Sequence, residues 1–186
     1  MLDHYLIEHC SPTLASIKTA NLFSCPFARE EDLEEQISVW NRLLDGKGIT
    51  LMILRKTDKA ALIYVCRLEK LAKDLKKPGV AEFLQVCGYE KTDPGSALEK
   101  LQERVSTQEN FPHEIGLFLG YPAEDVSGFI RHGARCAKCV GTWKVYGDEE
   151  SARKKFALYQ KCTRLYCEAY RKHNNLDRLL VRTHGS

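Results

Sequence analysis

The stretch from Pro112 to Tyr146 constrains the fold more than any other part of the sequence. It begins with a short apolar run, Ile115–Leu119, which is typical of a buried strand. A glycine ends this run, and Pro122 fits the first turn of a helix in which Glu124 and Asp125 stand where the helix dipole favours acidic residues. A cysteine-rich loop and a second strand follow. This order predicts an α/β protein with an interior strand in this stretch.

Polar side chains gather at both ends of this expected strand, and they suggest a binding site. Because ligands of open α/β sheets bind outside the carboxyl ends of the strands, we predict the main pocket at the turn that follows Leu119. The pocket should be lined by Tyr121 and by at least one of Glu124 and Asp125, with Lys144 or Lys18 across from them. The two acids oppose a bare anion, so the ligand should carry a cation, a metal ion or many hydroxyl groups.

The rest of the chain shows alternating helical and β-like patterns. Two β-like runs, Ile49–Lys56 and Ala60–Arg67, are separated by three polar residues and predict an antiparallel hairpin. Apolar spacing predicts helices over Thr13–Phe23, Ala28–Leu44, Leu68–Leu75, Val80–Val86, from Asp93 through Val105, and from Glu149 to about His173, while residues 2–10 could start a helix or a strand.

These elements predict one α/β (or α+β) domain over residues 1–186. It should have a mixed sheet of about four strands flanked by several helices, and a long C-terminal helix. The tail from Asn174 to Ser186 should be weakly structured, with a possible short strand from Leu179.

Charge and hydropathy exclude several classes of partner. Charged residues make up 28% of the chain, but the net charge is only +3 and the two signs are mixed, which argues against nucleic-acid or polybasic membrane binding. No stretch approaches the roughly 18 apolar residues of a membrane span. The N-terminus lacks the basic start of a secretory signal, so we expect a cytoplasmic protein.

Eight cysteines are many for a cytoplasmic chain, where disulfides are rare. Cys136 and Cys139 have the two-residue gap of a zinc or iron–sulfur site, or of a dithiol redox pair. The best completing ligands are Cys162 and Cys167, which lie about 140° apart around a helix, so one ion could not easily reach both. Alternative completing ligands are Cys10 and Cys25, with His132 nearby. Plain burial of the thiols remains open.

A thiol enzyme is the alternative. Cys10 would precede a helix that starts near Pro12, and a helix N-terminus favours the thiolate. His113 would then be the base, with Glu114 beside it. Such an enzyme needs Lys18, Asn21, His113 and Lys144 to converge on one cleft for a small anionic molecule. His113, Glu114, Glu124 and Asp125 could also be an acid/base set or ligands of a hard metal ion, or serve only structure.

Three blocks of sequence carry a resemblance to a known family: His9–Phe23, His113–Ile130 and Gly141–Tyr146. The chain resembles, over nearly its whole length, the bacterial family catalogued as domain of unknown function 3793. The resemblance implies a small cytosolic single-domain protein, whose site would use the polar residues of the blocks. It also implies a flavodoxin-like or iron-handling partner, because genes for such proteins are often neighbours of the family.

Three functions follow as expectations, and the sequence names no reaction for any of them. The first is the binding of a metal or a metal-containing cofactor (iron, haem, iron–sulfur or zinc) through cysteines. The second is a small-molecule enzyme that uses Cys10 with His113 as base. The third is an interaction module without a site.

Overall fold

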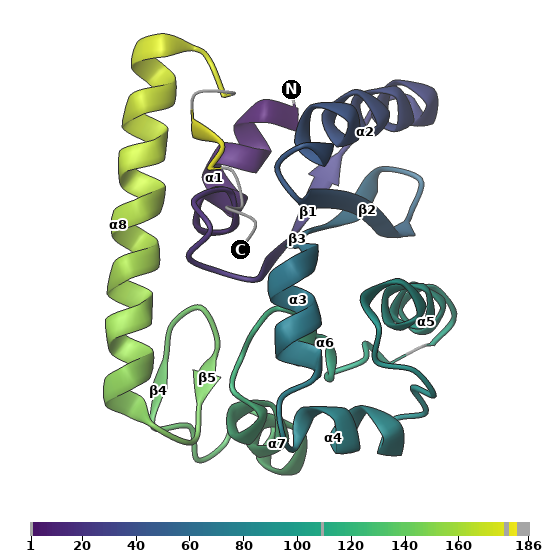
Figure 1. Ribbon diagram of the computed structural model, residues 1–186, viewed down its shortest axis with the longest axis vertical. Coiled ribbons are helices and arrows are strands. Elements are labelled where there is room, and N and C mark those ends of the chain that lie inside the picture. The colour runs from purple at the N-terminus through teal and green to yellow at the C-terminus, as the bar shows by residue number, and fades with distance from the viewer. Residues whose placement is uncertain (1, 109, 177–178, 182–186) are drawn as a thin grey trace.

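A computed structural model describes residues 2–108, 110–176 and 179–181 (Figure 1). The elements are α1 (Leu2–Leu14), β1 (Ala20–Pro26), α2 (Glu30–Asp45), β2 (Ile49–Lys56), β3 (Ala60–Arg67), α3 (Leu68–Leu75), α4 (Val80–Val86), α5 (Pro94–Thr107), α6 (Ile115–Phe118), α7 (Ala123–His132), β4 (Cys139–Val140), β5 (Lys144–Val145) and α8 (Glu149–His173). The α/β class and the long C-terminal helix are confirmed, and the prediction of one domain stays a prediction.

The main sheet is antiparallel and has the order β1-β3-β2, so it contains the predicted β2–β3 hairpin and has β3 as its central strand. Successive side chains of a strand point to opposite faces of the sheet. Ala61, Ile63 and Val65 of β3 therefore join one hydrophobic core, whereas Tyr64 and Cys66 join the other. β3 is apolar almost throughout because both of its faces are covered.

Helices cover the two faces in two groups. The first core is closed by α1 and α2, and Leu33, Ile37, Trp40 and Leu44 of α2 are buried at the predicted helical spacing. The second core is closed by the segment from α3 to α7, which lies below the sheet in Figure 1. The sheet is thus the middle layer of the molecule.

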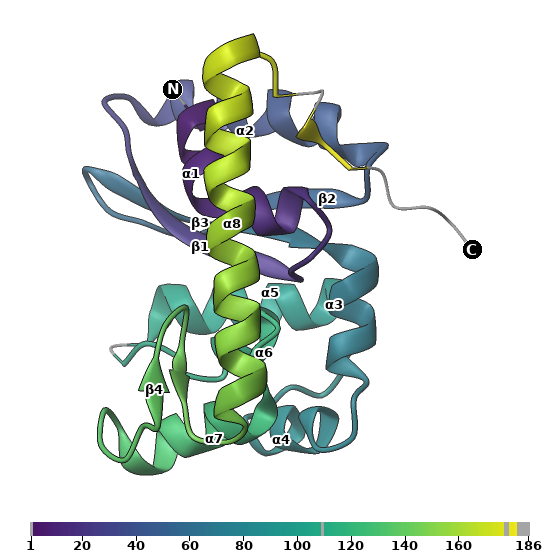
Figure 2. The same cartoon turned by 90° about the vertical axis from the view of Figure 1, so that its left-hand side faces the viewer.

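Helix α8 runs along one side of the molecule (Figures 1 and 2). Part of it packs against α1. Its N-terminal part packs against the β4–β5 hairpin, where Trp143, Val145, Ala152 and Phe156 form a third hydrophobic cluster. The helix therefore connects the N-terminal helix to the hairpin.

Arg67, at the end of β3, is 1% exposed and joins three parts of the chain. Its Nε donates to the carbonyl oxygen of Thr13 at 2.6 Å, and its Nη2 donates to those of Leu14 and Val181 at 2.6 and 2.8 Å. The carbonyl groups at the end of a helix have no partner within the helix. Arg67 therefore caps α1 and fixes the described C-terminal segment to it.

The predicted helix over Thr13–Phe23 is wrong. Ser11 and Pro12 suggested a helix start, but Pro12 lies in the last part of α1, and β1 already begins at Ala20. The carbonyl oxygen of Pro12 accepts from the backbone N–H groups of Ile17 and Lys18, both at 3.0 Å. These bonds close a turn after the helix and send the chain into the sheet.

The predicted interior strand over Ile115–Leu119 is also wrong, because residues 115–118 form the short helix α6. All four residues of α6 are buried. A run that is apolar on every side shows neither the period of an amphipathic helix nor that of a half-buried strand. In the described residues the sheet pairs are antiparallel, so the expected crevice at the carboxyl ends of parallel strands does not form.

Two smaller expectations are also corrected. The second strand of the stretch, β5, comprises only Lys144 and Val145. Leu179 has a single residue of 3₁₀ geometry, and no strand includes residues 179–181. Leu176 and Leu180 pack into the first core, so this described part of the tail is ordered. The remainder of the predicted strand, Arg182, lies outside the described residues.

Candidate functional site

A cleft with a volume of about 690 Å³ lies where α1, β1, α8 and the β4–β5 loop approach one another. Its lining is rich in polar side chains from both ends of the chain. They include Glu8, His9, Lys18 and Asn21 from the N-terminal region, and Tyr159, Gln160, Thr163 and Arg164 from α8.

Lys18 is the most unusual group in this cleft, because only 4% of the residue is exposed. The turn after α1 points its side chain inward, where its Nζ donates to the carbonyl oxygen of Ala20 and lies 5.4 Å from the ring centroid of Tyr121. Burial lowers the pKa of the Lys18 ammonium to about 8, and the nearby Cys10 only partly opposes this effect.

Asn21 and Tyr121 border Lys18. Asn21 stands on β1, and its Oδ1 accepts a hydrogen bond from the Thr13 hydroxyl at 2.7 Å. Tyr121 stacks on Trp143 with ring centroids 4.8 Å apart, and its hydroxyl donates to the carbonyl oxygen of Thr142. Burial raises the pKa of Tyr121 to about 12, so its phenol is neutral at pH 7. The structure thus brings together Lys18, Asn21 and Tyr121.

A second, smaller cavity of about 240 Å³ is also lined by Tyr121. His113, Asp125 and Lys144 line it as well, among apolar side chains. The sequence predicted one main pocket that contains Tyr121, an acid and a lysine. The structure divides that set: Lys18 lies with Tyr121 in the large cleft, and Asp125 and Lys144 lie with Tyr121 in the small cavity.

The carboxylate of Asp125 is fully engaged by the protein. Its Oδ2 accepts from the indole N–H of Trp143 at 2.7 Å, and its Oδ1 accepts from the backbone N–H groups of Tyr146 and Gly147 at 2.7 and 2.8 Å. Only 3% of the residue is exposed. Glu124 is exposed, lies against the backbone of Gly147 and lines neither cavity. Asp125 therefore fastens the hairpin to α7.

Glu114 also has structural partners. It is 4% exposed, and its Oε1 accepts from Arg104 Nε at 2.6 Å and from the hydroxyl of Tyr89 at 3.2 Å. His113, in contrast, packs edge-on against Phe129 with ring centroids 5.0 Å apart. The two neighbours in sequence thus face different surroundings, and Glu114 joins α6 to α5.

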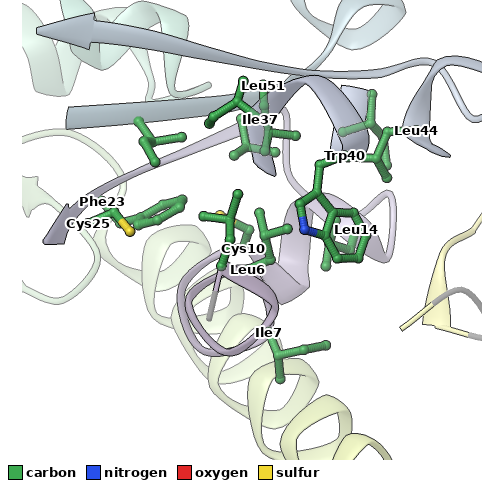
Figure 3. Packing of buried hydrophobic residues seen from close by; sticks show 14 of the residues in the cluster. Leu6, Ile7, Cys10, Leu14, Phe23, Cys25, Ile37, Trp40, Leu44 and Leu51 are labelled. Carbon is green, nitrogen blue, oxygen red and sulfur yellow. The ribbon is translucent and has the colours of Figure 1, made fainter. Parts of the chain in front are cut away.

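Cys10 lies in the first core rather than before a helix. It belongs to α1, is 0% exposed, and lies with Leu6 between that helix and the sheet (Figure 3). Burial raises the pKa of its thiol, with a smaller opposing effect from Lys18. Cys10 lines neither the cleft nor the cavity of His113, so the expected nucleophile and base are not brought together.

Thiol reactivity should follow this burial. Iodoacetamide is expected to modify the exposed Cys136 first, because a reagent can reach it, and to leave Cys10 and Cys66 unmodified in the folded protein. Burial raises the pKa of Cys66 to about 12, so almost no thiolate forms there either. Peptide mass spectrometry of timed samples measures the order. Labelling of Cys10 as fast as Cys136 would support the thiol-enzyme alternative.

The four cysteines of the expected metal site do not form one ligand group. Cys139 packs on the third cluster and Cys167 on the first, Cys136 is exposed, and Cys162 is buried in α8. Within residues 2–108, 110–176 and 179–181, no group of three or more His, Cys, Asp and Glu side chains could hold a metal ion. Metal binding through cysteines stays a prediction, which metal analysis of the purified protein would test.

The residues of α8 are the part of the cleft that sequence reasoning missed. Tyr159, Gln160, Thr163 and Arg164 recur at helical spacing and so share one face of α8. The polar face of this helix was the available signal. It is ambiguous, because a polar face of a helix usually faces only water.

The fold and the cleft define an α/β protein with a three-stranded antiparallel sheet and a polar cleft beside its C-terminal helix. Residues 6–180 match the model of the family described as "Protein of unknown function (DUF3793)", and the chain belongs to this family. No curated protein and no solved structure matches the chain. No helix among the described residues is long and apolar enough to cross a membrane.

Proposed function

We propose that the protein binds a small, hydroxyl-bearing organic anion in the large cleft, with Lys18 contacting the carboxylate or phosphate group. The observation that carries this proposal is an almost completely buried ammonium in the lining of a large cleft. Burial of a charge without a counter-charge costs free energy. A bound anion would supply the counter-charge and favour the protonated lysine.

The other lining groups suit the same ligand. Arg164 on α8 and His9 on α1 are exposed at the cleft and can add positive charge, whereas Glu8 opposes it. The amide and hydroxyl groups of Asn21, Thr142 and Thr163 can bond to hydroxyls of the ligand. A volume of about 690 Å³ lies within the usual range of ligand pockets. The cleft therefore fits a polar molecule better than an apolar one.

Replacement of Lys18 by methionine is expected to weaken anion binding at least tenfold, because a charge-assisted hydrogen bond is lost. The probes are citrate, inorganic phosphate and glucose 6-phosphate in titration calorimetry. Binding of citrate to the unmodified protein should fall as the pH rises through about 8, since the free ammonium then loses its proton. The facing Cys10 has a pKa above that of Lys18 and stays neutral in this range.

A matched control is Lys155→Met on the exposed surface of α8, which should leave binding unchanged. The melting temperature of Lys18→Met at pH 7 should be no lower than that of the unmodified protein. The pKa of Lys18 in the folded protein lies below the ordinary lysine value of 10.5, so between these two pH values the unfolded chain binds one more proton than the folded chain. Lys18 alone thus makes stability rise with pH in that window. The proposal would be contradicted if Lys18→Met bound every probe as tightly as the unmodified protein does. It would also be contradicted if the unmodified protein bound none of the probes.

We further propose that the protein works in a reducing compartment such as the cytoplasm. All eight of its cysteines are free thiols. Unpaired thiols are usual where glutathione and thioredoxin keep cysteines reduced.

A further inference from the structure

The second cavity has walls unlike those of the cleft. Its volume is about 240 Å³, and its lining is almost entirely apolar, with side chains from Phe111, Ile115, Val126, Phe129 and Trp143. An engineered apolar cavity of about 150 Å³ takes up benzene. This cavity therefore has room for one aromatic ring with a short substituent.

An ammonium group stands at this apolar cavity. Lys144 also lines it, and its Nζ lies 5.3 Å from the ring centroid of Phe129. Among the described residues no carboxylate pairs with Lys144, so the ring face is the contact that its charge makes. Such a contact attracts the cation but does not neutralise it. The charge remains available to an anion.

Asp125 is the carboxylate in the lining, and it does not compete for Lys144. Its two oxygens are taken by the indole of Trp143 and by two backbone N–H groups, as described above. Three donors compensate its charge. The hydroxyl of Tyr121 bonds to the carbonyl oxygen of Thr142, so the other ionisable groups in the lining are Lys144 and the exposed His113, which both contact Phe129.

We propose that this cavity binds a small aromatic monocarboxylate, with its ring against the apolar walls and its carboxylate on the Lys144 ammonium. The apolar walls favour transfer of a ring from water, and the cation selects an acid over a neutral ring. The site is separate from the Lys18 cleft, although Tyr121 lines both. It therefore stands whether or not the cleft binds an anion.

The test uses phenylacetate and its uncharged analogue phenylacetamide on the full chain. Phenylacetate should change the intrinsic fluorescence, because Trp143 lines the cavity, whereas Trp40, the other tryptophan, lies in the first core. With about ten heavy atoms, it should bind with a dissociation constant on the order of 0.1–1 mM. Phenylacetamide should bind at least tenfold more weakly. Saturation-transfer NMR of the two compounds gives a second readout that is independent of fluorescence.

Lys144→Met should reduce phenylacetate affinity at least tenfold and leave phenylacetamide unchanged, and Lys144→Gln is the second variant if methionine disturbs folding. Lys155→Met and Lys18→Met should keep phenylacetate binding, and the latter result separates this site from the cleft. Equal affinities for the acid and the amide would overturn the proposal. So would undiminished binding by both Lys144 variants, loss of phenylacetate binding in Lys18→Met, or no saturation by about 10 mM in both readouts.

Discussion

Replacement of Arg67 by alanine is expected to lower the free energy of unfolding by about 3–5 kcal/mol, because several buried hydrogen bonds from a charged group are lost together with the packing of a large side chain. The variant would remove the guanidinium donor from the carbonyl groups of Thr13, Leu14 and Val181, of which the first two keep one backbone N–H donor each. It would also leave a cavity at a site that is 1% exposed. Urea unfolding followed by circular dichroism measures the change. In a marginally stable protein, a loss of this size could leave the chain partly unfolded at 37 °C.

Arg67→Lys tests whether the charge or the fork of donors matters. Lysine keeps the charge but lacks the planar group that reaches several carbonyls, so it should restore only part of the stability. Arg42→Ala is the control, because Arg42 is exposed and, among the described residues, its side chain bonds only to Ser38 on its own helix. It should change stability by less than about 0.5 kcal/mol. A similar small change for Arg67→Ala would show that water can replace the guanidinium.

Asp125→Asn is expected to cost about 2–4 kcal/mol of stability, because a carboxylate that accepts three hydrogen bonds becomes an amide. Whichever way the amide is turned, its NH₂ meets an N–H donor, either the indole of Trp143 or the backbone of Tyr146 and Gly147. Thermal unfolding gives the stability, and near-ultraviolet circular dichroism reports whether Trp143 has loosened. If Asp125 were instead a ligand contact, as its predicted place in the pocket implies, the change would weaken ligand binding with little change in melting temperature.

Glu124→Gln is the matched control for this experiment. Glu124 stands beside Asp125 in the same first turn of α7, but it is exposed. Its replacement should cost only the small helix-dipole contribution, a few tenths of a kcal/mol. If Asp125→Asn kept its stability but bound phenylacetate more weakly, Asp125 would be a ligand contact rather than a stabilising group.

Much of the fold could be predicted because its helices and strands show clear periods. Leu33, Ile37, Trp40 and Leu44 are spaced for one helical face, and they are buried as expected. The β2–β3 hairpin followed from two β-rich runs with a short polar turn. The strand predicted over Ile115–Leu119 was wrong because a run that is buried on all sides shows no period. The helix predicted to start near Pro12 was wrong because proline is more common at the start of a helix than inside one, whereas Pro12 lies inside α1.

The candidate site could be predicted only in part. Lys18, Asn21 and Tyr121 lie in two of the three recognisable blocks, and the structure gathers them in one cleft. His113 and Lys144 were expected there too, but they line the second cavity. Their separation depends on how the α7 region and the hairpin pack around Tyr121. That packing is a tertiary property, which the local sequence does not encode.

The position of α8 has a consequence for the synthesis of the protein on the ribosome. Glu8 and Lys18 leave the ribosome long before Thr163 and Arg164, which face the same cleft. α1 likewise lacks its packing partner until α8 has emerged. Domains begin to fold during translation, but the cleft cannot assemble until α8 has emerged. A nascent chain stalled before α8 would therefore have an exposed α1 face and an incomplete cleft.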